Sequence, residues 1–197
     1  MNGAGKSSLA GAAIREAGGA YFNPDEGARA LLARHPDLTV AEVNAQAWAH
    51  GKRLLERAIR LRDDFTFETT LGGATITRLL GEALDAGLDV RMKFVGLASP
   101  ELHIARVRAR VARGGHDIPE ARIRARFESS RRNLVRLLPR LTELLVYDNS
   151  DDAAPDGDRP PMPTLVLHVV SGRIQSVMPA ASIPAWAKPI VMAALKL

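Results

Sequence analysis

The feature that most constrains this chain is a glycine-rich segment that ends in lysine and serine and continues into an amphipathic helix. Residues 2–8 are Asn-Gly-Ala-Gly-Lys-Ser-Ser, and apolar residues at helical spacing follow from Ser7 to Ala17. Glycines let successive backbone N–H groups turn inward around phosphate oxygens, a lysine bridges the outer phosphates, and a serine hydroxyl binds Mg²⁺. The segment therefore predicts a nucleotide-phosphate site; an incidental glycine-rich N-terminus is the alternative.

Every residue of this segment is a predicted nucleotide ligand: Asn2, Gly3, Ala4, Gly5, Lys6, Ser7 and Ser8. Ser7 is also the predicted Mg²⁺ ligand. The full pattern of such loops has a further glycine just before the position of Met1, and a buried strand precedes that glycine. We therefore expect this chain to lack the first strand of its fold.

Composition excludes several other classes of protein. A chain of 197 residues with 46% hydrophobic content is sufficient for one globular domain. Cysteine is absent from the sequence, which excludes a disulfide framework, a thiolate zinc site and a cysteine nucleophile. Charged residues interrupt every apolar run before it reaches the length of a membrane span, so we expect no membrane segment and a cytoplasmic location.

Strand and helix patterns alternate along the chain, which favours an α/β fold. Short apolar runs predict strands near residues 20–22, 65–69, 90–97 and 144–147. We predict a three-layer sandwich of the P-loop NTPase type, with a mainly parallel sheet, over residues 1–150. An acidic, proline-rich linker is expected over residues 151–163, and a small β-hairpin and helix over 164–197 complete the same domain.

Two acidic residues that follow predicted strands are candidates for chemistry. Asp25 lies where a carboxylate can accept the proton of a hydroxyl that attacks a phosphate, because ligands bind at the carboxyl edge of such sheets. In the alternative, Asn23 caps a helix and Asp25 only complements the helix dipole. Glu68 ends an apolar strand, where a carboxylate costs free energy unless it has a partner or binds a polyhydroxyl substrate. Capping of the next helix is the alternative for Glu68.

Arginine is concentrated in one part of the chain, where 11 of the 22 arginines lie between Arg106 and Arg140. Arg106, Arg110 and Arg113 share one helix face and lead into Gly114-Gly115-His116. Three interpretations are open: a solvated helix surface, a nucleic-acid groove, or a lid that closes over phosphates. No aromatic residue lies between Arg106 and Arg124, so the sequence lacks the stacking platform of a nucleic-acid groove. His116 is a candidate base or a hydrogen-bonded turn residue.

In this order, these segments resemble the zeta toxin family of P-loop kinases. The resemblance rests on residues 2–8, 22–26, 67–71, 106–120, 133–134 and 147–150, and it covers about residues 2–150. Its best-known members transfer the γ-phosphate of ATP to a hydroxyl of UDP-N-acetylglucosamine, and an antitoxin protein holds them inactive.

The resemblance implies an ATP-dependent kinase with a small-molecule hydroxyl substrate, ATP and Mg²⁺ as cofactors, and an antitoxin as a possible partner. It implies four catalytic residues: Lys6, Asp25, Arg106 and Arg113. It implies four substrate-binding residues: Glu68, Thr69, Thr70 and His116. A P-loop ATPase or nucleic-acid-binding protein that uses the arginines of residues 106–140 is the alternative function.

Overall fold

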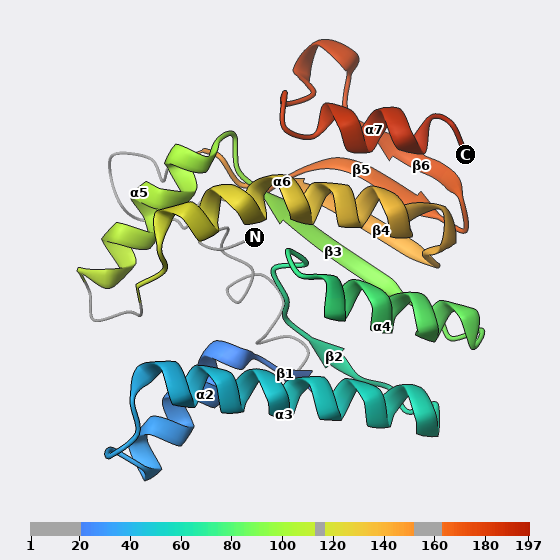
Figure 1. The fold of residues 1–197 in the computed structure, drawn as a ribbon. Helices are drawn as coiled ribbons and strands as arrows, with labels where there is room; N and C mark the ends of the chain where they lie inside the picture. The colour runs from blue at the N-terminus through green and yellow to red at the C-terminus, as the bar shows by residue number, and fades with distance from the viewer. Residues whose placement is uncertain (1–20, 113–116, 152–162) are drawn as a thin grey trace. The chain divides into compact units, whose positions relative to one another are not determined.

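The computed structural model describes residues 21–112, 117–151 and 163–197. The chain divides into two compact units, Lys6–Thr69 and Thr70–Leu197, the second of which also includes Met1–Gly5 (Figure 1). The predicted phosphate loop, the apolar segment that follows it, Arg113 and His116 lie outside the described residues. The two units are described separately.

The described part of the smaller unit holds two short parallel strands and two helices. Strand β1 (Tyr21–Phe22) pairs with β2 (Thr66–Phe67) so that Tyr21 lies opposite Thr66. Helix α2 (Pro24–Arg34) follows β1, and the long helix α3 (Val40–Leu61) comes next, with its buried residues at helical spacing. A reciprocal capping box between Thr39 and Glu42 begins α3, which stabilises its first turn.

The Phe22 ring fixes β1 on these two helices. A Cβ atom added to Gly51 of α3 would lie 2.3 Å from Cε1 of Phe22, and one added to Gly27 of α2 would lie 3.3 Å from the same ring. Any larger residue at Gly51 would displace the ring, because real Cβ contacts are never this short. Glycine in α3 therefore sets the position of β1 and of the residues that follow it.

The larger unit is built on a four-stranded sheet in the order β3-β4-β5-β6. Strands β3 (Arg91–Gly96) and β4 (Glu143–Asp148) are parallel, as predicted for buried strands joined by helices. Strands β5 (Thr164–Val170) and β6 (Arg173–Val177) form the predicted C-terminal hairpin, and β5 pairs antiparallel with β4. The predicted α/β architecture is confirmed.

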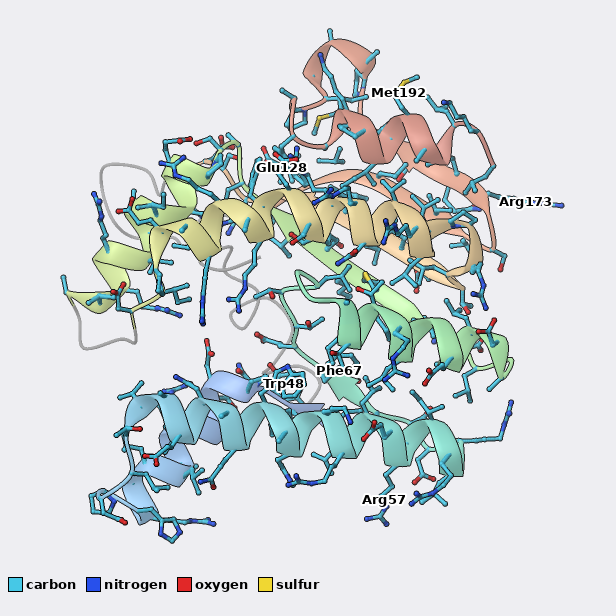
Figure 2. All side chains as sticks on the ribbon, in the orientation of Figure 1. Trp48, Arg57, Phe67, Glu128, Arg173 and Met192 are labelled. Carbon is cyan, nitrogen blue, oxygen red and sulfur yellow. The ribbon has the colours of Figure 1, made fainter. Side chains whose placement is uncertain are left out.

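The helices of the larger unit include α4 (Ala74–Asp85), α5 (Pro100–Val111), α6 (Glu120–Leu137) and α7 (Lys188–Ala194), with short 3₁₀ turns η1 (Leu138–Arg140) and η2 (Ala180–Ser182). Helix α6 contacts α4, α5 and α7 (Figure 1). Glu128 lies on its exposed face, and Met192 of α7 is 54% exposed (Figure 2). Helix α6 thus joins the other helices of this unit.

Trp186 secures the C-terminal segment to the sheet. Its indole is 2% exposed and packs on Gly96, where an added Cβ would lie 2.4 Å from the ring. Its Nε1 donates a hydrogen bond of 2.9 Å to Asp148 Oδ1 at the end of β4. A buried indole N–H needs such an acceptor, so the chain after residue 163 packs as part of this core.

Candidate active site

Asp25 lies in the first turn of α2, at the carboxyl end of β1. The side-chain oxygen of the buried Asn23 accepts a hydrogen bond of 2.9 Å from the backbone N–H of Asp25. Asn23 is therefore the N-cap of α2, with Pro24 at the first helical position, as the sequence predicts. The side chain of Asp25 is exposed, and it is not the N-cap of α2.

Glu68 follows β2 at the same edge of this parallel pair. Its backbone N–H donates to the carbonyl oxygen of Phe22 at 3.0 Å, which extends the pairing by one residue. Its carboxylate Oε1 accepts a hydrogen bond of 2.5 Å from the hydroxyl of Tyr21. The structure thus brings Asp25 and Glu68 to one strand edge, the position where ligands bind in open α/β sheets.

Tyr21 is the partner that a half-buried carboxylate at this position requires, and sequence reasoning missed it. Burial, together with the hydrogen bond to Glu68, raises the pKa of the Tyr21 phenol well above its usual range. The phenol therefore stays protonated and continues to donate to Glu68 at neutral pH. The contact depends on the parallel pairing of β1 with β2, in which Tyr21 lies opposite Thr66, two residues before Glu68, and the sequence carries no local signal for that pairing.

Replacing Tyr21 by phenylalanine is expected to lower stability by about 1 kcal/mol, the usual net contribution of a hydrogen bond. The ring is retained, so the change reports on the phenol–carboxylate bond alone. Urea unfolding of the wild type and the variant measures the difference. An unchanged unfolding midpoint would show that Tyr21 does not hold Glu68.

Thr69 and Thr70 come directly after Glu68, and both are half-buried. The hydroxyl of Thr70 accepts a long hydrogen bond of 3.5 Å from the backbone N–H of Gly72. Leu71, which lies between Thr70 and Gly72, is 2% exposed and has a φ of 54°, in the left-handed region. The predicted substrate-binding threonines are therefore followed by a tightly turned loop.

The structure places Arg106 on the segment after β4. Its Nη2 donates to the backbone carbonyl oxygen of Asp151 at 3.1 Å and to that of Ser150 at 3.5 Å. Arg106, one of the arginines predicted to share a helix face, thus contacts the chain beyond Asp148. This contact orients the guanidinium at the carboxyl end of β4, the sheet edge that the fold uses for ligands.

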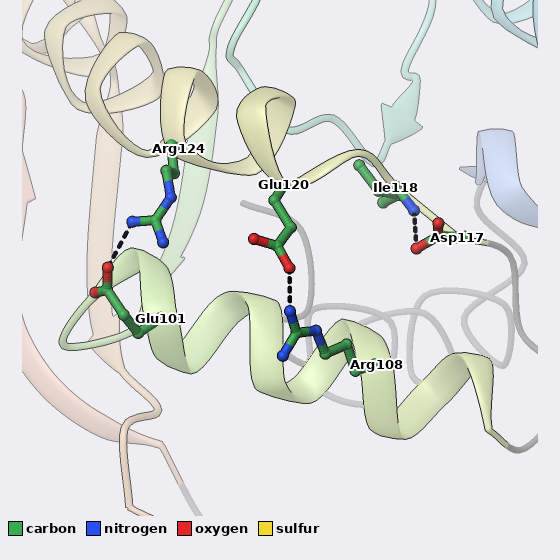
Figure 3. A network of polar contacts seen from close by, with 6 residues as sticks. All are labelled: Glu101, Arg108, Asp117, Ile118, Glu120 and Arg124. Atoms are coloured by element: carbon green, nitrogen blue, oxygen red, sulfur yellow. Dashed lines mark hydrogen bonds and ion pairs between the residues drawn. The ribbon is translucent and has the colours of Figure 1, made fainter.

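Ion pairs join α5 and α6, the helices before and after Gly114-Gly115-His116, which is the hinge of the predicted lid (Figure 3). Arg124 Nη1 lies 2.5 Å from Glu101 Oε1, and Arg108 pairs with Glu120. The hydrogen bond from Arg124 lowers the pKa of the exposed Glu101. Both pairs are exposed to solvent, so they contribute little to the stability of the helix pair.

A hollow of about 430 Å³ lies between the same two helices. Apolar side chains of α5, of α6 and of the segment just before α6 cover much of its wall, chiefly Ile104, Val107, Val111, Ile118 and Ile123. Its polar rim includes Arg108 and Glu120.

Among the residues that the structure describes, no group of His, Asp or Glu side chains is suited to hold a metal ion. The predicted Mg²⁺ ligand, Ser7, is outside those residues. In the same described ranges, no helix is both long enough and apolar enough to cross a bilayer.

The sequence of residues 1–154 matches the zeta toxin family, described as "Zeta toxin". The chain belongs to the zeta toxin family. This match covers most of the chain and includes the predicted phosphate loop, Asp25, Glu68 and the arginine-rich helices. The resemblance drawn from the sequence motifs is therefore confirmed, while the roles of individual residues stay predictions.

One relative is similar to this chain in sequence, and three solved structures are similar to it in fold. An uncharacterized protein of Haemophilus influenzae is 32% identical over 126 residues, which are 64% of this chain and 86% of the relative. A structure of the PezAT toxin–antitoxin system of Streptococcus pneumoniae has a TM-score of 0.56 at 15% identity, and the alignment covers 100% of this chain and 82% of that one.

Two structures of AvrRxo1-ORF1 with AvrRxo1-ORF2 have a similar fold. The structure with sulphate ions has a TM-score of 0.68 at 18% identity and covers 94% of this chain. The structure with ATP has a TM-score of 0.66 at 17% identity and covers 98% of this chain. This zeta toxin family protein spans 61% and 60% of those two chains. At such identities the likeness shows a shared fold.

Proposed function

We propose that this chain is an ATP-dependent phosphotransferase that moves the γ-phosphate of ATP to a hydroxyl of a small molecule. A UDP-N-acetyl sugar is the first candidate acceptor, as the family resemblance implies. The observation that carries the proposal is the family match over residues 1–154, which contains the Gly5-Lys6-Ser7 loop. The likeness to a fold solved with ATP supports the choice of nucleotide.

In the proposed reaction, Asp25 accepts the proton of the acceptor hydroxyl as the hydroxyl oxygen bonds to the γ-phosphorus. The bond between the γ-phosphorus and the bridging oxygen to the β-phosphate breaks, and ADP leaves with that oxygen. Lys6, Arg106 and Arg113 stabilise the charge on the phosphate oxygens. Glu68, Thr69, Thr70 and His116 bind the acceptor. The hydroxyl of Ser7 suits Mg²⁺, which prefers oxygen ligands and neutralises phosphate charge when bound.

We further propose that the protein works in the cytoplasm, where its nucleotide is abundant, and that an antitoxin protein holds it inactive. The similar structure from Streptococcus pneumoniae belongs to the PezAT toxin–antitoxin system, which supports a partner of this class. A nucleic-acid partner is not favoured, because several arginines of residues 106–140 are already paired with carboxylates. The pairs are Arg108–Glu120, Arg124–Glu101, Arg131–Glu128 and Arg140–Asp85.

Nucleotide binding gives a first test of this proposal. The purified protein is expected to bind a fluorescent ATP analogue saturably in Mg²⁺, to release it when unlabelled ATP is added, and to bind it at least about tenfold more weakly in EDTA. A titration followed by fluorescence anisotropy measures all three effects. Failure to bind in Mg²⁺, with the protein folded by circular dichroism, would contradict the proposal.

A further inference from the structure

The loop after the predicted acceptor residues has a backbone that its own sequence does not favour. Leu71 is a non-glycine residue at a φ of 54°, and its side chain is buried. A leucine in the left-handed region is strained, and such a conformation persists only where surrounding contacts hold it. Thr70, which we propose to contact the acceptor, immediately precedes this residue.

Two side chains of α6 make those contacts with three successive backbone carbonyls. Asn133 Nδ2 donates to the Leu71 carbonyl oxygen at 2.8 Å and, more weakly, to that of Gly73 at 3.5 Å. Ser129 Oγ donates to the carbonyl oxygen of Gly72 at 2.9 Å. Asn133 is only 9% exposed, so its bond to Leu71 is shielded from competing water.

The helix and the loop are also in direct van der Waals contact. A Cβ atom added to Gly72 would lie 2.7 Å from Cγ of Arg126 and 3.4 Å from Oγ of Ser129. Ser129 and Asn133 are four residues apart on α6 and therefore present a single face to the loop. Only glycine allows the backbone to approach that face closely enough for the Ser129 hydrogen bond.

This contact borders a hollow of about 400 Å³. Besides Gly72, Ser129 and Asn133, its wall includes Thr77, Arg78 and Arg136. Ser129 and Asn133, which hold the loop, thus also line this hollow together with two arginines.

We propose that Ser129 and Asn133 are positioning residues for the acceptor. They hold residues 70–73 in the turned conformation and so set the orientation of Thr70 toward the substrate hydroxyl. This inference rests on the proposed phosphotransferase function. It adds that α6, which begins just beyond the predicted hinge, determines acceptor binding through the loop rather than by contact with ATP.

Neighbouring serines on α6 provide a matched pair of variants. Ser129→Ala removes the hydrogen bond to the loop, whereas Ser130→Ala removes one that stays inside the helix, from Ser130 Oγ to the Arg126 carbonyl oxygen. Asn133→Asp keeps the size of the side chain but replaces the donor toward Leu71 by an acceptor oxygen. Ser129→Thr retains the hydroxyl and serves as the conservative rescue.

The experiment measures steady-state kinetics of each variant with ATP and with the acceptor that the wild type phosphorylates, starting from UDP-N-acetylglucosamine. We expect Ser129→Ala and Asn133→Asp to lower kcat/KM for the acceptor by about 10–100-fold, the usual effect of a small misplacement, with the KM for ATP within about twofold of wild type. Ser130→Ala and Ser129→Thr are expected to keep both kcat/KM for the acceptor and the KM for ATP near their wild-type values. Melting temperatures of all four variants show how much each change destabilises the fold.

A purely structural role predicts a different pattern. If Ser129→Ala and Asn133→Asp change the KM for ATP by the same factor as kcat/KM for the acceptor, or change neither constant, the positioning role is wrong. The wild type would still be a kinase in either case. If the wild type transfers phosphate to no acceptor in a broad metabolite panel, the proposed function fails, and this inference fails with it.

Discussion

Replacing Lys6 by alanine is expected to abolish ATP turnover and to weaken nucleotide binding by one to two orders of magnitude. In a phosphate loop the lysine ammonium bridges the outer phosphates, and each hydrogen bond to a charged group contributes about 1.5–3 kcal/mol. The loss of one such bond therefore weakens binding by about 10–100-fold, because 1.4 kcal/mol corresponds to a factor of ten. Equilibrium titration with ATP, and ADP release in the presence of acceptor, measure the two effects.

A second lysine controls for the loss of positive charge. Lys196→Ala removes an exposed lysine near the C-terminus, far in sequence from the predicted loop. Its ATP affinity and turnover are expected to equal those of the wild type, and it should unfold at the wild-type temperature because an alanine at an exposed site changes stability little. Lys6→Ala is expected to unfold at the same temperature, since the predicted role of Lys6 is to face a ligand. Normal turnover in Lys6→Ala would contradict the assignment of the phosphate loop.

Asp25→Asn is expected to lower turnover by about 10²–10⁴-fold, the contribution of a positioned general base, while ATP affinity stays near the wild-type value. The amide keeps the size of the side chain but cannot take up the proton of the acceptor hydroxyl. Helix α2 should remain intact, because Asn23 and not Asp25 caps it. Single-turnover measurements separate the chemical step from product release.

The adjacent carboxylate is the control for this variant. Glu26 also lies in the first turn of α2, so Glu26→Gln removes the same charge from the same helix end. Its turnover is expected to stay within about twofold of wild type, with any loss of stability shared by both variants through the helix dipole. Persistent turnover together with reduced stability in Asp25→Asn would show that Asp25 serves only the helix.

Features that depend on neighbours in the sequence could be predicted. Asn23 was considered as the cap of a helix, and its side-chain oxygen accepts a hydrogen bond of 2.9 Å from the backbone N–H of Asp25. The buried strand expected over residues 90–97 is β3, Arg91–Gly96. Helix caps and apolar runs depend on a few consecutive residues, so a single sequence is sufficient to find them.

Contacts between distant residues could not be predicted in the same way. Tyr21 lies 47 residues from Glu68, and Ser129 lies 57 residues from Gly72. Each depends on which strands pair and which helix crosses which loop, and one sequence does not specify those choices. The hairpin over residues 164–177 was likewise predicted, but its antiparallel pairing with β4 is a property of the fold.

The same limit applies to the arginines. Periodicity places Arg106 on a helix face, but only the structure shows its contacts with the carbonyl groups of Ser150 and Asp151. Arg131 shows a further use of the charge: its guanidinium lies 4.2 Å from the centroid of the Phe127 ring and also donates to the Trp186 carbonyl oxygen at 3.3 Å. Some arginines of this region thus stabilise the fold, which composition alone does not reveal.

Phosphoryl transfer itself is the most direct test of the account. The protein is incubated with ATP labelled in its γ-phosphate, Mg²⁺ and either UDP-N-acetylglucosamine or a metabolite panel, and products are identified by mass. We expect ADP to form together with an acceptor that has gained one phosphate, at a rate that Asp25→Asn reduces by about 10²–10⁴-fold. ATP consumption that yields only inorganic phosphate, or equal transfer by wild type and Asp25→Asn, would contradict the proposal that this chain is a small-molecule kinase with Asp25 as its base.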